Sequence, residues 1–482
     1  MILPLALILC FMVGCQEKEA MAELEAMKAQ LEAEKQNNES NKDAFIEWAK
    51  DNASEITTLE PGSGFDDLRS LQKSIGDARM VFIGESRHDA HEHFKFKHRL
   101  VEFLVEEMGF TLFAMEESLP YGDRINKYVL GGEGDPEALL NNMGNWFVWD
   151  TKEVLELIKW MRTYNSDPKH DKKVEFYGVD VTDPIPAIEN MLVYLEKVDS
   201  ELADLLKNKL EKLQLLNTKI RSEREITERY LSLSDDEADY LGEFISGFCD
   251  DFQNNRSKYV SKSSKSEFEW MLQQVKSVIV AHDIYKMRRP GANGVALSRE
   301  DGMTNNIRWL LGRDTRRIVL WAHNWHIART PIYISGYRQW EPEEFEPFGF
   351  HISKELGDDL YSIGFSFYQA NYKDLKPSEG DMLGAVFKMV GRQMFFLDLK
   401  ASPKRGPVFK WLNQKHKMRG GAFGEGAVSS FYPVKTYDAI IFTNSITETE
   451  LSPVSLKRRV LILAQPIFQG FQITRIRYNF TG

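Results

Sequence analysis

Short apolar runs alternate with amphipathic stretches along most of the chain, as expected when strands and helices follow one another. β-Branched or aromatic runs bounded by turn residues predict strands. Such runs lie at Met80–Gly84, Thr111–Met115, Val174–Val179, Arg317–Ala322, Leu360–Phe367, Met394–Leu399 and Asp438–Thr443. The pattern over Ala90–Met108 predicts an amphipathic helix that stops at Gly109. The predicted fold class is therefore α/β, with a largely parallel or mixed central sheet flanked by helices.

The stretch 185–290 has a different pattern. It contains long, charged, leucine-rich segments such as LADLLKNKLEKLQLLN and almost no strand signal. We therefore predict a helical insertion lobe between two halves of the α/β domain, 43–184 and 291–482, the second of which includes a C-terminal extension. A lobe in this position commonly covers a cleft, and clefts between lobes bind small ligands. The glycine-rich run Arg419–Gly426 is expected to form a loop.

The first fifteen residues, MILPLALILCFMVGC, carry an apolar run that is too short to span a bilayer comfortably. This run ends in Met12-Val13-Gly14-Cys15, a pattern like a bacterial lipobox. We therefore predict a lipoprotein signal peptide over 1–15 and a lipid on Cys15 that anchors the protein to a membrane of the cell envelope, facing the periplasm or the outside. A start-site artefact and an uncleaved anchor are the alternatives. The charged segment 16–42 is expected to be a flexible tether.

Composition and net charge indicate the size of the core and exclude some classes of binding partner. The 482 residues are 43% apolar, which is enough for a large core and suggests more than one lobe. The formal charge of −11 repels phosphate backbones and argues against a nucleic-acid partner. Of the three cysteines, Cys10 would leave with the signal peptide and Cys15 would carry the lipid, so Cys249 has no partner for an internal disulfide.

The first stretch that indicates chemistry is VFIGESRHDAHEHF. Gly84 lets the chain turn sharply after the strand. Asp89 and Glu92 are spaced like a capping box, which predicts that the next helix starts at residues 89–90. His88 would then lie just before a helix N-terminus, and Glu85 could hold one of its ring nitrogens so that the other faces a water molecule. This arrangement suits general-base catalysis.

Other titratable residues end later strands. Glu116 and Glu117 follow TLFAM, Asp180 follows VEFYGV, and His323 and His326 follow IVLWA. The carboxyl ends of parallel strands meet at one edge of a sheet, so several such residues together indicate a site. The alternative is that some of them, His326 in particular, cap helices or pair with arginines.

These motifs, in this order, resemble the pattern of the erythromycin esterase family. The motifs that carry the resemblance are Gly84-Glu85-Ser86-Arg87-His88, Gly109-Phe110, Glu116, Trp160-Met161-Arg162 with Asn165, Gly178-Val179-Asp180, Arg299-Glu300-Asp301-Gly302-Met303 with Asn305, and Trp321-Ala322-His323-Asn324-Trp325-His326. The resemblance covers about residues 45–445. The family name comes from macrolide lactones, whose hydrolysis gives antibiotic resistance.

The resemblance implies hydrolysis of a small-molecule ester or lactone by a water molecule, with no cofactor and no covalent enzyme intermediate. His88 matches the general base of the family, and Glu85, Glu116 and His323 match its other essential positions. Lys97 stands where the family has an arginine, and it keeps the charge without the planar fork. We therefore predict that Lys97 binds the substrate or steadies an oxyanion. Asp180 and His326 are likewise predicted to bind the substrate.

Arg87 departs from the family, which usually has threonine or serine just before the histidine. A guanidinium beside His88 would lower the pKa of the imidazole, and it could bind a carboxylate or phosphate of the substrate. These effects predict a preference for anionic esters. The alternative is that Arg87 points away and pairs with Glu85 or Glu117.

Two other functions stay open on the sequence. His88, His91 and Glu92, or His323 with His326, could bind zinc in a metal-dependent hydrolase or peptidase, although the chain has no His-Glu-x-x-His motif. A non-catalytic lipoprotein that binds a small molecule is the other alternative. A serine nucleophile at Ser86 is not favoured, because the second glycine of a Gly-x-Ser-x-Gly elbow is missing.

Overall fold

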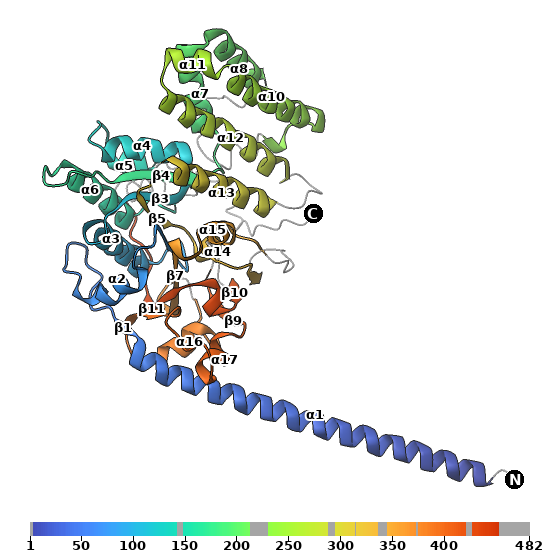
Figure 1. Cartoon of the computed structure of the whole chain (residues 1–482). Helices are drawn as coiled ribbons and strands as arrows, with labels where there is room; N and C mark the ends of the chain where they lie inside the picture. The colour runs from blue at the N-terminus through green and yellow to red at the C-terminus, as the bar shows by residue number, and fades with distance from the viewer. Residues whose placement is uncertain are drawn as a thin grey trace, which may run out of the picture.

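The structure is a computed structural model that describes residues 3–141, 148–212, 230–287, 295–313, 315–335, 345–372, 375–420 and 427–452. At its centre lies an eight-stranded sheet in the order β1-β8-β11-β7-β2-β5-β3-β4 (Figure 1). The strands from β11 to β4 run parallel, whereas β8 and β1 add antiparallel pairs at one edge. The predicted fold class, an α/β fold with a largely parallel or mixed sheet flanked by helices, is confirmed.

The strands of this sheet are β1 (Ser54–Glu55), β2 (Met80–Ile83), β3 (Phe110–Ser118), β4 (Glu175–Asp180), β5 (Arg317–Trp321), β7 (Leu360–Ala370), β8 (Met394–Asp398) and β11 (Ala439–Ile446). Each predicted strand overlaps one of them, and only the short β1 was not predicted. A second, three-stranded sheet was also missed; it consists of β6 (Tyr333–Ser335), β10 (Val428–Phe431) and β9 (His416–Arg419). Of the predicted loop Arg419–Gly426, residues 421–426 lie outside the described residues.

Helices cover both faces of the sheet because every central strand is apolar on both sides. In β2, Val81 and Ile83 face one core while Met80 and Phe82 face the other. The first face is covered by α2 (Arg69–Ile75), α3 (His91–Glu106), α4 (Leu119–Val129), α5 (Pro136–Asn141) and α6 (Lys152–Ser166). The second is covered by the end of α1 (Leu3–Asn52), α13 (Val295–Arg313), α14 (Asn324–Ile327), α15 (Phe348–Leu356), α16 (Leu383–Lys388) and α17 (Pro407–Leu412). Short turns η1 (Asp66–Leu68), η2 (Gly357–Asp359) and α18 (Pro433–Thr436) complete the domain.

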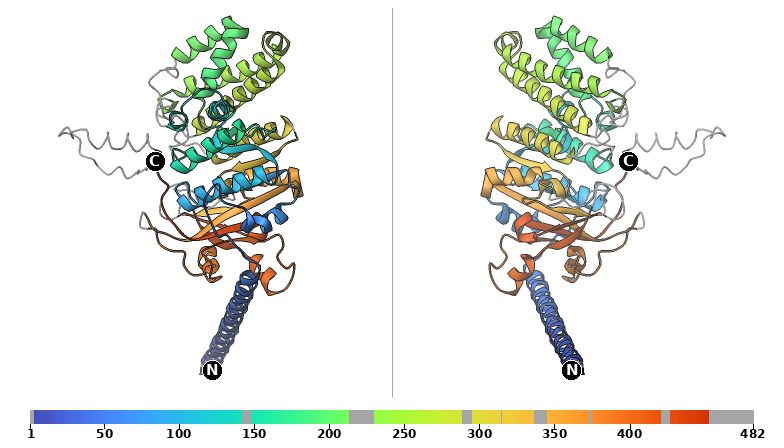
Figure 2. Two further views of the ribbon diagram at one scale, coloured as in Figure 1. Left: turned by 90° about the vertical axis from the view of Figure 1, so that its left-hand side faces the viewer. Right: turned by 90° about the vertical axis from the view of Figure 1, so that its right-hand side faces the viewer.

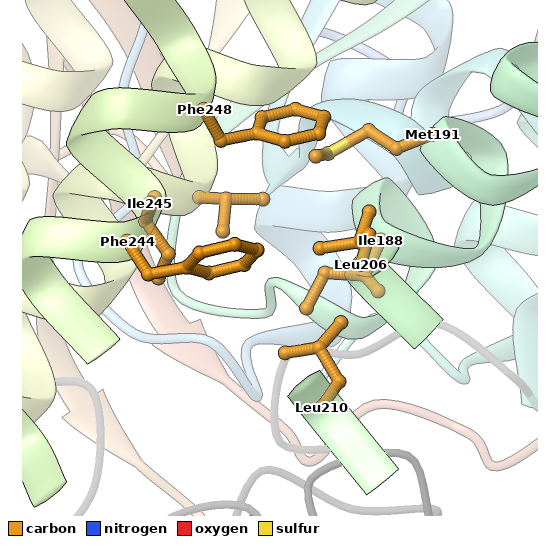
Figure 3. A pocket seen from close by; sticks show the side chains of 8 residues that line it. Ile188, Met191, Leu206, Leu210, Phe244, Ile245 and Phe248 are labelled. Carbon is orange, nitrogen blue, oxygen red and sulfur yellow. The ribbon is translucent and has the colours of Figure 1, made fainter. Parts of the chain in front are cut away.

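The insertion forms a separate helical lobe at one end of the molecule, beyond α4 and α13 (Figures 1 and 2). It contains α7 (Ile185–Val198), α8 (Ser200–Lys212), α10 (Asp235–Asn254), α11 (Arg256–Lys262) and α12 (Lys265–Met287), packed around a core of their own. A pocket between these helices is lined by apolar side chains such as Met191, Phe244 and Phe248 (Figure 3). All the described side chains that line this pocket are apolar, so none of them offers a group for hydrolysis.

The N-terminal segment is a helix where the sequence predicted a flexible tether over 16–42. The single helix α1 includes that segment and projects from the domain (Figure 1). Alanine, glutamate, lysine and glutamine dominate the segment, and their high helix propensity explains the difference. Three of its apolar residues, Met21, Met27 and Leu31, are more than half exposed, and Leu24 is 44% exposed. From Phe45, which stacks on Trp411 with ring centroids 4.0 Å apart, the helix joins the domain core.

Among the described residues, no helix is both long enough and apolar enough to cross a membrane. The signal peptide over 1–15 and the lipid on Cys15 stay predictions. In the lobe, Cys249 is buried and has no disulfide partner.

Candidate active site

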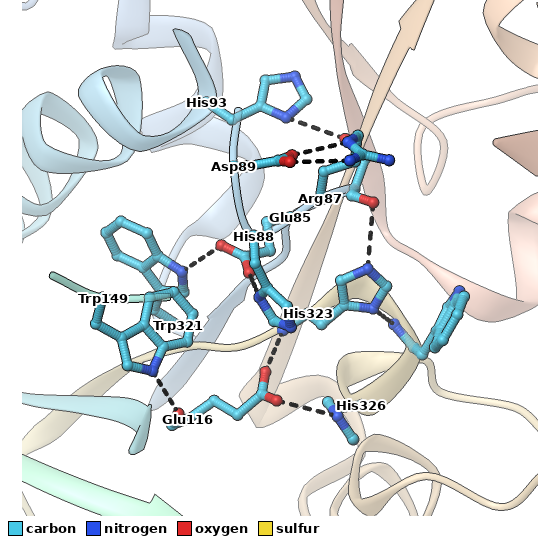
Figure 4. A network of polar contacts seen from close by, with 12 residues as sticks. Glu85, Arg87, His88, Asp89, His93, Glu116, Trp149, Trp321, His323 and His326 are labelled. Carbon is cyan, nitrogen blue, oxygen red and sulfur yellow. Dashed lines mark hydrogen bonds and ion pairs between the residues drawn. The ribbon is translucent and has the colours of Figure 1, made fainter. Parts of the chain in front are cut away.

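The predicted site residues gather where the carboxyl ends of β2, β5, β3 and β4 meet, because these strands are parallel neighbours. These residues are at most 8% exposed, and most of them are drawn in Figure 4. The set consists of Glu85 and His88 after β2, Glu116 in β3, Asp180 at the end of β4, and His323 and His326 after β5. This gathering of six titratable residues at one edge of the sheet makes it the candidate active site.

Gly84 allows the chain to leave β2 in the required direction. A Cβ atom at this position would lie 2.1 Å from Oδ1 of Asn324. The Asn324 side chain cannot move away easily, because it donates to the carbonyl of Phe365 at 2.7 Å and accepts from the Phe365 N–H at 3.0 Å. Glycine at position 84 therefore lets Glu85 and His88 turn into the site beside β5.

The central pair consists of Glu85 and His88. Oε1 of Glu85 accepts from Nδ1 of His88, while Oε2 accepts from Nζ of Lys97 and Nε1 of Trp321, each at 2.7 Å. Burial raises the pKa of Glu85, but the charge of Lys97 and the hydrogen bond from His88 outweigh this effect and hold the pKa below its ordinary value. Glu85 is thus an ionised carboxylate that fixes the Nδ1–H tautomer of His88, so Nε2 is the ring nitrogen that can accept a proton.

Lys97 holds the carboxylate of this pair in place. Its side chain is fully buried, and Nζ lies 3.7 Å from the centroid of the Trp321 ring. Burial lowers the pKa of Lys97 to about 8, even though Glu85 stabilises its charge. The sequence predicted that Lys97 binds the substrate. Its burial and its bond to Glu85 fit a group that positions Glu85.

His323 contacts the same loop through its ring. Nε2 donates to the carbonyl of Ser86 at 3.2 Å, and Nδ1 accepts from the N–H of Trp325 at 3.3 Å. Burial lowers the pKa of His323 to about 3, so the ring is neutral. Its centroid lies 5.2 Å from that of His88. Because backbone groups occupy both ring nitrogens, the geometry favours a positioning role for His323 over proton transfer.

Glu116 links the two sides of the site. Oε2 accepts from the backbone N–H of His323 at 2.8 Å, and Oε1 lies 3.2 Å from Nε2 of His326 (Figure 4). Oε1 also contacts Nη2 of Arg299 at 2.9 Å. Burial raises the pKa of Glu116, but His326 and Arg299 outweigh it and hold the pKa well below the ordinary value. Nε1 of Trp149 donates to the Glu116 carbonyl at 3.0 Å, and its ring meets that of His88 edge-on. Glu116 is therefore a fixed anion between His88 and His326.

Asp180 and Arg299 form an ion pair beside this anion. Oδ2 of Asp180 accepts from Nη2 of Arg299 at 2.6 Å, and Oδ1 accepts from Nε at 3.2 Å. Asp180 is fully buried, whereas the Arg299 side chain is 27% exposed. The sequence predicted that Asp180 binds the substrate. The structure shows that it holds Arg299, the more accessible partner of the two.

Arg87 points toward Asp89. Its Nε and Nη2 donate to the two carboxylate oxygens of Asp89 at 2.8 and 2.9 Å, and Nε also lies 3.3 Å from the hydroxyl of Tyr372. The sequence left open whether Arg87 binds an anionic substrate or pairs with Glu85 or Glu117. In the structure the guanidinium of Arg87 forms these two hydrogen bonds with Asp89, and not with Glu85 or Glu117.

The remaining residues of the HDAHEHF stretch have other partners. The predicted capping box is wrong, because α3 begins at His91 with Ala90 as its N-cap and no side-chain cap. Glu92 accepts from the N–H and the hydroxyl of Thr447, at 2.7 and 2.8 Å. Nδ1 of His91 lies 2.5 Å from Glu153, and Nδ1 of His93 lies 3.2 Å from the Ser86 hydroxyl.

Metal binding was the alternative chemistry on the sequence. Within the described ranges, no three histidine, cysteine, aspartate or glutamate side chains converge in a way that could hold a metal ion.

Sequence reasoning missed several residues of the site. Arg299 and Glu300 were noted in a family motif without a role, and Trp149 was not noted at all. Arg299 reaches Asp180 across 119 positions and Glu116 across 183 positions of the sequence. No local pattern could indicate these pairs, but the presence of Arg299 in a motif was a usable signal.

The family model for erythromycin esterase matches residues 105–446, about 70% of the chain. The chain belongs to the erythromycin esterase family. The match begins near the end of α3, so it leaves out Glu85, His88 and Lys97.

Relatives and solved structures agree with this assignment. Erythromycin esterase type II of Escherichia coli is 25% identical over 344 residues, which are 69% of this chain and 79% of that protein. The putative hydrolase YbfO of Bacillus subtilis (strain 168) is 22% identical over 408 residues, or 79% and 86% of the two chains. A Bacillus cereus protein has a similar structure, with a TM-score of 0.72, 24% identity and coverage of 85% and 99%. A mutant of the erythromycin esterase EreC in its open conformation gives a TM-score of 0.68 at 15% identity, covering 83% of this chain and 98% of that one.

Proposed function

We propose that this member of the erythromycin esterase family hydrolyses a carboxylic ester or lactone by direct attack of a water molecule activated by His88. The observation that carries the proposal is the buried Glu85–His88 pair, which Lys97 and Trp321 hold in one orientation at the carboxyl edge of the sheet. A macrolide lactone is one substrate to test, because the Escherichia coli relative carries the name erythromycin esterase.

In this mechanism His88 removes a proton from water through Nε2 while the hydroxide attacks the carbonyl carbon. The imidazolium that forms is stabilised by Glu85, to which Nδ1–H donates. Lys97 keeps Glu85 ionised and in place, so the carboxylate needs no reorganisation when the positive charge develops. Glu116 adds a second negative charge close to His88.

Ser86 supports direct attack by water over a serine nucleophile. Its side chain is fully buried, and its hydroxyl faces Nδ1 of His93 at 3.2 Å. Burial lowers the pKa of His93 to about 3, so the ring is a poor base.

Activity should not depend on an added or removed metal. The experiment is a panel of esters and lactones, a macrolide included, assayed with purified protein before and after incubation with EDTA and 1,10-phenanthroline. We expect hydrolysis of at least one substrate at an unchanged rate, because His88 supplies the base. The opposite result is one zinc ion per protein molecule, with activity that is lost when the zinc is removed and regained when zinc is added back. This result would assign the chemistry to a metal instead.

A further inference from the structure

His326 differs from the other histidines of the site, His88 and His323, because a carboxylate lies beside each of its ring nitrogens. Its Nδ1 lies 2.6 Å from Oε1 of Glu300, and its Nε2 lies 3.2 Å from Oε1 of Glu116. The ring stacks on Phe348, with centroids 6.0 Å apart and planes 6° apart. Glu300 is itself fixed, because its Oε2 accepts from the Phe348 N–H at 2.8 Å. The imidazole is thus held between two carboxylates by packing on one side and ion pairs at both nitrogens.

The charged groups around His326 come from two elements. β3 contributes Glu116, and α13 contributes Arg299 and Glu300; the neutral His323 lies just after β5. Burial alone would lower the pKa of His326, but Glu300 and Glu116 outweigh it and raise the pKa to about 10. His326 is therefore an imidazolium at neutral pH, while the neighbouring His323 is not.

We propose that His326 is the general acid of the reaction, which donates its Nε2 proton to the leaving oxygen of the ester. This role rests on the proposed hydrolysis with His88 as the base. Glu116 lies between the rings of His88 and His326, so base and acid flank one carboxylate (Figure 4). The Nε2 contact to Glu116, at 3.2 Å, is at the long end of the range for an N–H···O bond, so its proton can be shared with a substrate oxygen.

The protons balance over one turnover. His88 takes one proton from water, and the resulting hydroxide adds to the carbonyl carbon to form a tetrahedral intermediate. When the intermediate collapses, the electron pair of the breaking C–O bond goes to the leaving oxygen, which takes the Nε2 proton of His326 and departs as the alcohol. His88 then releases its proton to solvent and His326 takes one up. Nη1 of Arg299 lies 3.2 Å from Nε2 of His326, so it can donate to this nitrogen once the proton has left.

A general acid matters most when the leaving group is strongly basic, because an alkoxide is expelled slowly without a proton while a nitrophenolate is not. The test therefore compares two esters with the same acyl group, ethyl butyrate and p-nitrophenyl butyrate, in wild type and in His326→Gln. We expect kcat/KM for the ethyl ester to fall on the order of 10²–10⁴-fold, and that for the nitrophenyl ester to change only a few-fold. His351→Gln is the matched control, since His351 lies on α15 and contacts only the exposed Glu346 among its described ion pairs.

Two further measurements make the result decisive. In wild type the ratio of the ethyl-ester rate to the nitrophenyl-ester rate should fall only as the pH approaches about 10, the value to which Glu300 and Glu116 raise the pKa of His326. Titration of Lys97 near pH 8 affects both esters and leaves this ratio unchanged. In Glu300→Gln this basic limb should move to lower pH, and ¹⁵N NMR of labelled histidines should show the His326 ring losing its proton at lower pH as well.

Equal losses for the two esters in a folded His326→Gln protein would overturn the general-acid role and leave the proposed function standing. If wild type hydrolyses neither ester nor any lactone of the panel, the proposed function itself fails, and the role of His326 falls with it.

Discussion

Replacing His88 with alanine is expected to lower kcat/KM for ester hydrolysis on the order of 10²–10⁴-fold, the usual contribution of a general base. The reason is that Nδ1 of His88 is bonded to the fixed carboxylate of Glu85, which leaves Nε2 of the ring to take the proton from water. His323 cannot replace it, because backbone groups occupy both of its ring nitrogens and its pKa is lowered to about 3. The measurement is steady-state kinetics on the best substrate of the panel.

His351→Ala is the matched control for this change, because it also removes an imidazole, and the described ion pair of His351 is with Glu346, which is not part of the site. Its rate should equal that of wild type. Circular dichroism and thermal unfolding would verify that both variants are folded. A folded His88→Ala protein that loses only a few-fold in rate would remove His88 from the role of base.

Substituting Lys97 by methionine is expected to destabilise the fold by about 3–5 kcal/mol, as is typical when one partner of a buried ion pair is removed. Methionine fills a similar volume, but it leaves the fully buried Glu85 carboxylate without the cation at 2.7 Å. The expected result is a lower urea midpoint in unfolding followed by tryptophan fluorescence. The double variant Glu85→Gln with Lys97→Met should be more stable than Lys97→Met alone, because no uncompensated charge stays buried.

Lys95→Met is the control on the same helix. Lys95 pairs with Glu60 at the surface, where both side chains are partly exposed, so its loss should change stability by less than about 1 kcal/mol. Equal urea midpoints for Lys97→Met and Lys95→Met would show that the Glu85–Lys97 pair does not stabilise the site.

Much of the fold could be predicted from the sequence because buried parallel strands leave continuous apolar runs that are easy to find. The two-residue β1 and the short strands of the second sheet have no such signal. The segment 16–42 was predicted to be a tether because its apolar residues are few; its helix rests instead on the propensity of polar residues such as glutamate and lysine.

The site could be predicted in part for a similar reason. Parallel topology brings strand ends together, so Glu85, His88 and Glu116 were expected to meet. Which carboxylate contacts which cation depends on pairings that are distant in the sequence, such as Asp180 with Arg299. The capping box failed in the same way, since Glu92 is bound by Thr447, which is 355 positions away.

The most direct test of direct water attack is a single turnover in H₂¹⁸O, with enzyme in excess over a lactone or ester that it hydrolyses. The account predicts one ¹⁸O in the product carboxylate, no label in the alcohol, and no change in the intact mass of the enzyme at any time. A covalent acyl-enzyme mass, or an unlabelled first product with ¹⁸O transferred to a glutamate of the enzyme, would contradict it.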